Sequence, residues 1–311
     1  MEFLRRPLEF VTWLMLALGL LFGVLMLADP RVIEGAPAWL KPLKFAVSTA
    51  IYSATLAWVL RYLPDWPRLA RRAAAVTAWV FVVEVALIAL QAARGTTSHF
   101  NTSNAFDGTI FSVMGGAIAA QTVAAVTVTW ALFRQTFADR AMGWALRLGM
   151  TLAVAGASVG GMMTQPTAAQ LAQARETKQM PRAGAHTVGA PDGGAGLPGT
   201  GWSLAHGDLR VPHFVGLHAM QALPFVAWLL ARRRGARESA RLGIVAGAAV
   251  SYAALFVLLL AQAMMGQPVI APAGALASAF AAWAIGTVVF VLVAWRALGA
   301  TVTSRTALEI A

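Results

Sequence analysis

The chain has 311 residues, of which 59% are hydrophobic and only 12% are charged. A soluble globular domain carries about twice that charged fraction, so the composition excludes an ordinary soluble protein. The absence of cysteine excludes disulfides, thiolate-ligated clusters and covalently attached c-type haem. The net charge of +11 does not indicate nucleic-acid binding, because the basic residues cluster at the ends of apolar runs, as membrane anchors do.

The first apolar run, 10–28, follows Arg5 and Arg6 and resembles a signal peptide in its flanking charge. It is too long for a signal-peptide core and Met26-Leu27-Ala28 lacks the small-x-small cleavage pattern, so we expect a membrane helix. Along the whole chain, apolar runs of spanning length predict an all-α, single-domain bundle (1–311) of about eight transmembrane helices. The expected spans are 10–28, 43–62, 73–93, 108–133, 143–164, 213–231, 242–265 and 273–295.

The distribution of lysine and arginine predicts the topology. Sixteen of the 24 basic residues fall at the two termini and in alternate loops, with RRRGARESAR as the densest group. The positive-inside rule then places both termini in the cytoplasm, which predicts a multi-pass protein of a bacterial inner membrane. All five histidines fall on the opposite, outer side or at its membrane boundary. Polar residues collect at membrane interfaces in any case, so the one-sidedness is compatible with a site but does not require one.

The polar segment 94–111, RGTTSHFNTSNAFDGTIF, joins the third and fourth expected spans. It is more polar than a connector needs, with Ser98 beside His99 and with Asp107 near a helix start. Asp107 and Ser98 are candidate catalytic groups, and His99 is a candidate metal ligand. For Asp107 the alternative is a helix cap, because carboxylates favour the first turn of a helix.

The second expected span begins WLKPLKFAVSTAIYS, which places Lys41 and Lys44 at its outer end. Lys44, Ser48 and Tyr52 form one polar stripe at four-residue spacing. Lysines here often extend toward water, but two of them also suit an anionic partner such as a phosphate, a haem propionate or an aspartate. Lys41 and Lys44 are therefore candidate cofactor-binding residues, together with Arg210.

Glu84 falls near the middle of the third expected span. A carboxylate inside a membrane is costly and is a functional hypothesis by default. Three interpretations remain open: a protonated core residue, a proton relay, or a partner for a polar group on another helix. Gln91 lies two turns away on the same helix face, toward the loop that carries His99.

The long outer loop, 165–212, begins QPTAAQLAQARETKQ, which suggests a short surface helix, and continues as AGAHTVGAPDGGAGLPGTGW. The second part has the composition of flexible coil, yet His186, Asp192 and Trp202 are not typical linker residues. Because a loop of this length in a compact protein is usually functional or disordered, we expect a lid over the outer face.

Residues 206–218 read HGDLRVPHFVGLH and carry three histidines. Asp208 suits either a helix start or a metal ligand. His213 and His218 differ by about 140° around a continuous helix, so both bind one metal only if His213 precedes the helix. Otherwise they face different neighbours, and we expect His218 to point into the bundle toward His99. His186 and Asp208 complete the candidate metal ligands.

KPLKF, SHFN, AHTVGAPDGG and GDLRVPHFVGLH together resemble a family of uncharacterised bacterial multi-pass inner-membrane proteins. That resemblance implies a membrane location and no particular activity. A more distant similarity is to the alkaline ceramidase superfamily of zinc amide hydrolases, which use a serine and a histidine on one helix, an aspartate on the next and two histidines on a late helix. Ser98, His99, Asp107, His213 and His218 follow that order in this chain. The late histidines are five apart rather than four and the helix count differs, so the likeness is one of ordering.

Three functions remain open from the sequence. The first is a membrane oxidoreductase or hydrolase whose outer histidines hold zinc, iron, copper or a b-type haem and act on a small molecule or lipid from the periplasmic side. The second is a transporter or receptor with a polar path and no chemistry. The third is an accessory subunit or oligomer, for which the small-residue faces GGAIAA and GASVGG would suit helix packing. The polar path would consist of Glu84, Gln91, Gln121, Gln221 and Gln262.

Overall fold

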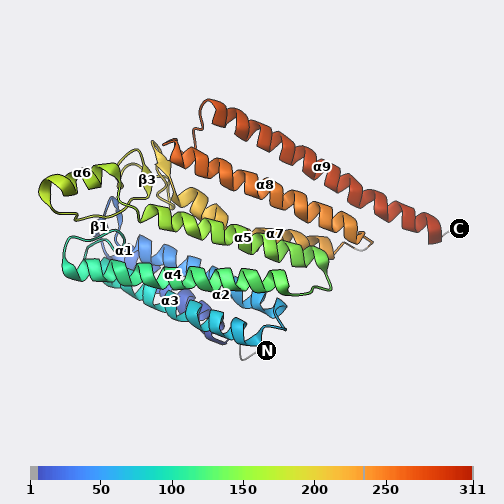
Figure 1. Ribbon diagram of the computed structural model, residues 1–311, viewed down its shortest axis with the longest axis horizontal. Helices are drawn as coiled ribbons and strands as arrows, with labels where there is room; N and C mark the ends of the chain where they lie inside the picture. The colour runs from blue at the N-terminus through green and yellow to red at the C-terminus, as the bar shows by residue number, and fades with distance from the viewer. Residues whose placement is uncertain (1–5, 234, 310–311) are drawn as a thin grey trace.

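The computed structural model describes residues 6–233 and 235–309, which form an elongated helical bundle (Figure 1). In this part of the chain, eight helices are long and apolar enough to cross a membrane, which confirms the predicted all-α membrane fold. The helices are α1 (Arg6–Ala28), α2 (Leu40–Val59), η2 (Leu60–Tyr62), α3 (Pro67–Ala93), α4 (Ala105–Arg134), α5 (Arg140–Met163), α6 (Ala168–Thr177), α7 (Arg210–Ala231), α8 (Glu238–Met264) and α9 (Ala275–Glu309).

Local signals explain where these helices begin. The side chain of Asn104 accepts a hydrogen bond from the amide of Asp107 to cap α4, and Asp139 caps α5 in the same way. Pro67 occupies the first turn of α3, where its missing N–H costs nothing. Most of the helices begin a few residues before the expected spans, because their first turns hold polar or charged residues that an apolar window leaves out.

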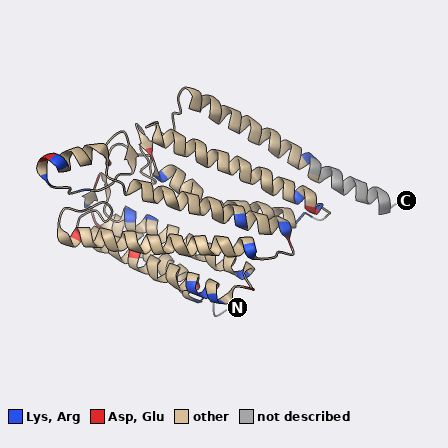
Figure 2. Ribbon diagram, in the orientation of Figure 1, with Lys and Arg blue, Asp and Glu red and all other residues tan. Residues whose placement is uncertain are grey.

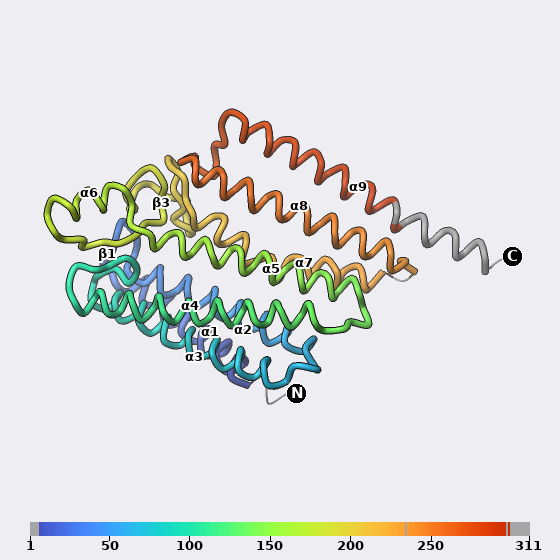
Figure 3. The backbone as a smooth tube through the Cα atoms, in the orientation of Figure 1, coloured from blue at the N-terminus to red at the C-terminus, as the bar shows by residue number. Residues whose placement is uncertain are grey.

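The backbone trace shows two unlike ends of the bundle (Figure 3). One end carries the start of α1 and the start of α8, and we call it the terminal end. The other, the loop end, carries the long connection between α5 and α7 with α6. Two short antiparallel pairs also lie there, β1 (Val32–Ile33) with β2 (Ala36–Pro37) and β3 (Thr187–Val188) with β4 (Gly207–Asp208). Lysine and arginine gather toward the terminal end (Figure 2).

The predicted surface helix is confirmed as α6. Thr167 and Gln170 form a reciprocal capping box at its start, and none of its residues is buried. The long connection between α5 and α7 is therefore not featureless coil, since it contains this helix and the β3–β4 pair.

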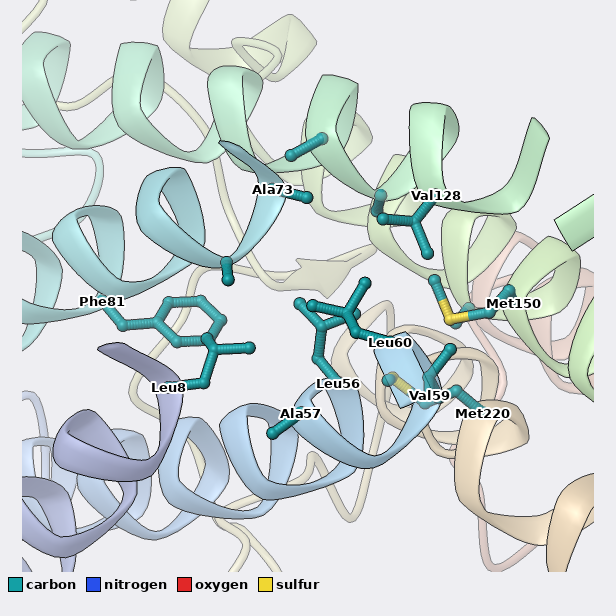
Figure 4. Packing of buried hydrophobic residues seen from close by; sticks show 14 of the residues in the cluster. Leu8, Leu56, Ala57, Val59, Leu60, Ala73, Phe81, Val128, Met150 and Met220 are labelled. Carbon is teal, nitrogen blue, oxygen red and sulfur yellow. The ribbon is translucent and has the colours of Figure 1, made fainter. Parts of the chain in front are cut away.

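The main hydrophobic core lies between α1, α2, α3 and the inner faces of α4, α5 and α7. Figure 4 shows Leu8 close to Phe81, with Leu56 and Leu60 nearby. Large apolar side chains on the outside remain exposed, including Leu27 at 86% and Trp13 at 72%. A water-soluble protein rarely leaves so much apolar surface uncovered, whereas lipid accommodates it.

Helices α5 and α7 pack closely through glycine. A Cβ atom added to Gly156 would lie 2.6 Å from the backbone of Gly216, and one added to Gly216 would lie 2.5 Å from Gly156. Small residues at such a crossing let two backbones approach and gain dispersion contacts that larger side chains would prevent. This crossing fixes the rotation of α7 and therefore the direction of its histidines.

We predict that Gly156→Ala lowers the stability of the bundle by about 1–3 kcal/mol, because the added methyl overpacks the crossing. Gly161→Ala on the same helix is the matched control, because no heavy atom lies within 4 Å of its added Cβ. That control should be neutral or slightly stabilising. Thermal unfolding in detergent measures both variants, and equal shifts in the two would contradict this packing.

Candidate functional site

The centre of the candidate site is Glu84 on α3, which is 1% exposed. Neither carboxylate oxygen has a hydrogen-bond partner among the described residues. Nε2 of His99 lies 3.5 Å from Oε1 of this carboxyl group. A buried carboxyl group without hydrogen bonds is energetically expensive, so its presence requires a reason.

His99 reaches Glu84 because the connection between α3 and α4 turns down into the bundle. Ser98 and Phe100 are each 2% exposed, and Phe100 has a φ of +62°, which few non-glycine residues adopt. The α5–α7 connection fastens this turn, since the amide of Ala183 donates to the carbonyl of Phe100 over 2.9 Å. Segments about 80 residues apart in the chain therefore set the position of one imidazole.

The imidazole of His99 is held on both sides. Its Nδ1 is hydrogen-bonded to Oγ of Ser98 at 3.0 Å, and its Nε2 faces Glu84. The ring also packs against Phe45 of α2, with centroids 5.4 Å apart. Its side chain keeps 20% of its surface exposed, whereas Glu84 behind it keeps 2%. The ring thus lies between the loop end and the buried carboxyl group.

Burial lowers the pKa of His99 well below its usual value, and the nearby groups Lys41, His186 and His213 lower it further. At neutral pH the ring is therefore uncharged. A neutral imidazole with two hydrogen-bonding nitrogens can accept a proton at one and release another at the other.

His186 and Asp192 form a second pair above this ring. Nδ1 of His186 lies 2.9 Å from Oδ2 of Asp192, which also accepts the guanidinium of Arg182 at 2.8 Å. Burial raises the pKa of Asp192, but the hydrogen bonds from His186 and from the amides of His186 and Thr187 more than offset this and lower it well below its usual range. Burial lowers the pKa of His186, and Asp192 partly compensates. Asp192 therefore organises the connection rather than standing free.

Asp208 and Arg210 are paired with one another. The guanidinium of Arg210 donates to the carboxylate at 2.6 Å and to the carbonyl of Gly201 at 2.6 Å. Asp208 also accepts the amides of Ser203 and of Arg210, the first residue of α7, although the N-cap of this helix is Leu209 and has no side-chain cap. Lys44 donates to the carbonyl of Thr200 at 3.0 Å. These groups hold the loop to the bundle.

Lys41 differs from these residues. It is partly buried at the start of α2, and its ammonium forms no hydrogen bond or ion pair with any described residue. Its charge nevertheless lowers the pKa of both His99 and His186, which places it within electrostatic reach of both rings.

Asp107 ties α3 to α4. Its carboxylate accepts Nε2 of Gln91 at 2.8 Å and the guanidinium of Arg94, and its other oxygen accepts Asn104. The helix cap is Asn104 rather than Asp107, because the chain turns into the helix one residue after Asn104. Every contact of this carboxylate is structural, and none reaches His99.

The two histidines of α7 point to different neighbours. The helix runs without a break through both, so the five-residue spacing separates them as a continuous helix requires. Nδ1 of His213 donates to the carbonyl of Gly156 at 2.7 Å, and the ring of His218 packs on Phe214 at 4.2 Å. The expected meeting of His218 with His99 is wrong: no hydrogen bond, ion pair or ring contact joins these two described residues.

The geometry does not assemble the expected metal-ligand set. In the residues that the structure describes, no three His, Asp or Glu side chains come together in a way that could hold a metal ion. The reason is visible residue by residue: Asp192 is taken by His186, Asp208 by Arg210, and His213 by a backbone carbonyl. The expectation of zinc, iron, copper or haem therefore finds no support in this geometry.

Further polar groups lie buried in the same helices, deeper in the bundle. Nε2 of Gln121 on α4 donates to the hydroxyl of Tyr52 on α2 at 3.1 Å. The hydroxyls of Ser53 and Thr77 and the amide oxygen of Gln121 are buried without a partner in the part of the chain that the structure describes. Ser53 and Thr77 were not predicted as site residues, because one small hydroxyl residue in an apolar run carries no signal of its own.

Comparison with known proteins assigns no family: no protein-family model matches the chain, and neither a curated protein nor a solved structure does. The resemblance to inner-membrane proteins and the ordering shared with the ceramidase superfamily therefore stay predictions.

The pKa of His99 leads to a testable pH dependence. In the unfolded chain a histidine has a pKa of about 6.5, whereas burial holds the pKa of folded His99 well below that value. Between these two pKa values the unfolded chain binds more protons than the folded chain. The contribution of neutral His99 to the free energy of unfolding is therefore fully present above about pH 6.5 and is lost as the pH falls toward the folded pKa. We predict that the unfolding temperature of the wild type decreases on acidification, and that the unfolding temperature of His99→Gln decreases less steeply with pH. Parallel pH profiles for the two proteins would contradict the neutral, buried state of His99.

Proposed function

We propose that this chain is a proton-translocating membrane protein, a transporter in which His99 passes protons between the loop end and Glu84. The observation that carries the proposal is the carboxyl group of Glu84, buried without a hydrogen bond and 3.5 Å from Nε2 of His99. Of the roles open to a membrane carboxylate, a proton relay is the one that needs a titratable partner beside it.

The surroundings of Glu84 favour the role of a proton acceptor over that of a permanently charged group. A permanently charged carboxylate in this position would be expected to have hydrogen-bond donors or a cation in contact, as Asp107, Asp192 and Asp208 do. Among the described residues, Glu84 has a neutral imidazole beside it and no lysine or arginine in contact, although the charge of Lys41 acts on it from a distance. That imidazole keeps a partly exposed surface, so a proton can reach it from the loop end.

The interior beyond Glu84 supports a continuing path. From the rise of a helix, Glu84 lies about 14 Å and Thr77 about 24 Å below the loop-end terminus of α3. The buried hydroxyls of Ser53 and Thr77 and the amide oxygen of Gln121, which have no partner among the described residues, are groups that internal water usually satisfies. A hydrated line between α2, α3 and α4 would carry protons from Glu84 toward the terminal end.

The sidedness follows from charge. If the terminal end, with most of the basic residues, faces the cytoplasm, then His99 faces the periplasm of a bacterial inner membrane. The relay would then take protons from the outer side.

A second candidate is an acid–base enzyme acting at the loop end. It is favoured by one observation, the hydrogen bond between Ser98 and His99, which gives the order serine, histidine, carboxylate that nucleophilic catalysis uses. Ser98 is only 2% exposed, however, so a substrate carbonyl has no route to its hydroxyl in this conformation. The geometry supports proton transfer better.

Proton flux into vesicles that contain the purified protein tests the proposal. We predict that Glu84→Gln slows flux driven by a membrane potential by at least about tenfold, because the relay loses its titratable group. Glu238→Gln is the matched control, since it removes an exposed carboxylate at the terminal end. Flux that survives in Glu84→Gln, or that falls equally in both variants, would contradict the proposal.

Ser98→Ala separates the two candidates. A proton relay keeps the titratable nitrogen of His99 and should retain most of its flux, whereas an enzyme that uses Ser98 as nucleophile would lose its activity entirely. Loss of flux in Ser98→Ala comparable to that in Glu84→Gln would show that the serine does more than orient the ring.

A further inference from the structure

A groove lies between α3 and α4 near the terminal end, away from the site around Glu84. Its volume is about 1040 Å³, and its walls come from the first turns of α3 and the second half of α4. The walls are mostly apolar, with Val76, Val123 and Ala124 among the lining residues. Val76 and Val123 also remain 37% and 63% exposed, which leaves the groove open toward the surface of the bundle.

Two arginines line the mouth of this groove. Arg68 and Arg72 are one helical turn apart, so both point to the same side of α3. Both are exposed, and neither forms a hydrogen bond or an ion pair with a described residue. Asp65 also lines the mouth, but its carboxylate accepts Nε2 of Gln135 at 2.7 Å. The mouth therefore keeps an excess of positive charge.

The groove has the two parts that a phospholipid requires. Its apolar walls run along α3 from Pro67 to Val76, which is about 14 Å of depth and matches the upper part of an acyl chain. Trp66, whose ring meets Trp130 at 4.9 Å, borders it at the level where aromatic rings anchor membrane proteins. A pair of unpaired guanidinium groups at that level suits a phosphodiester, which they can bind through several donors.

We infer that this groove is a binding site for one anionic phospholipid of the leaflet at the terminal end. The acyl chain lies between α3 and α4, and the phosphate is held by Arg68 and Arg72. The charge at the mouth distinguishes such a site from general lipid contact, because zwitterionic lipids of equal chain length would fill the groove without the same ionic attraction.

Native mass spectrometry of the full chain tests this site. The protein is mixed in detergent with equal amounts of phosphatidylglycerol and phosphatidylcholine that have identical acyl chains. We expect the wild type to retain phosphatidylglycerol about tenfold better, and we expect Arg68→Gln with Arg72→Gln to abolish the preference. Arg71→Gln is the matched control, because Arg71 is exposed in the same turn but does not line the groove. An unchanged preference in the double variant, or an equal loss in the control, would overturn the proposal.

A second pair of variants tests the apolar part. Ala120 lines the groove, whereas Ala119 does not, and both are exposed, so a larger side chain at either position leaves the core intact. Ala120→Phe should fill the groove and reduce retention of the lipid several-fold, whereas Ala119→Phe should retain it as the wild type does. Equal retention in these two variants would show that the acyl chain lies elsewhere and would overturn the assignment.

Discussion

The burial of one carboxyl group, that of Glu84, is the constraint on which the loop end of this protein depends. Taking such a group out of water costs several kcal/mol unless it is neutralised or hydrogen-bonded. Among the described residues, none donates a hydrogen bond to it and no lysine or arginine is in contact with it. Instead, the connection between α3 and α4 brings His99 down to it, and the architecture around that connection keeps the imidazole in place.

Three acidic residues that are fully engaged elsewhere make this arrangement possible. Asp107 joins the end of α3 to the start of α4, Asp192 folds the connection around His186, and Asp208 fastens the start of α7 through Arg210. Each carboxylate is matched by an arginine and by further donors, which is the condition for a buried charge to be stable. Glu84 is the exception among the buried acidic side chains described, and this contrast carries the functional proposal.

Local patterns predicted the parts of the structure that depend on local physics. Hydropathy predicted the eight spans and the segment QPTAAQLAQARETKQ indicated α6, because spanning length and a helix held by its own capping box depend only on neighbouring residues. The position of His99 could not be predicted, because it depends on the left-handed backbone of Phe100 and on a hydrogen bond to Ala183, about 80 residues away. The predicted contact of His218 failed for a similar reason: the Gly156–Gly216 crossing sets the rotation of α7 and turns His213 toward α5.

The most direct measurement of proton transfer between His99 and Glu84 is infrared difference spectroscopy of the protein in membranes, which follows the carboxyl stretch of Glu84 after a change of pH or a transfer to heavy water. A relay through the imidazole predicts a band that responds rapidly in the wild type, is absent in Glu84→Gln and responds at least about tenfold more slowly in His99→Gln. A band that responds equally fast without the imidazole would contradict the relay, because Glu84 would then exchange protons by another route.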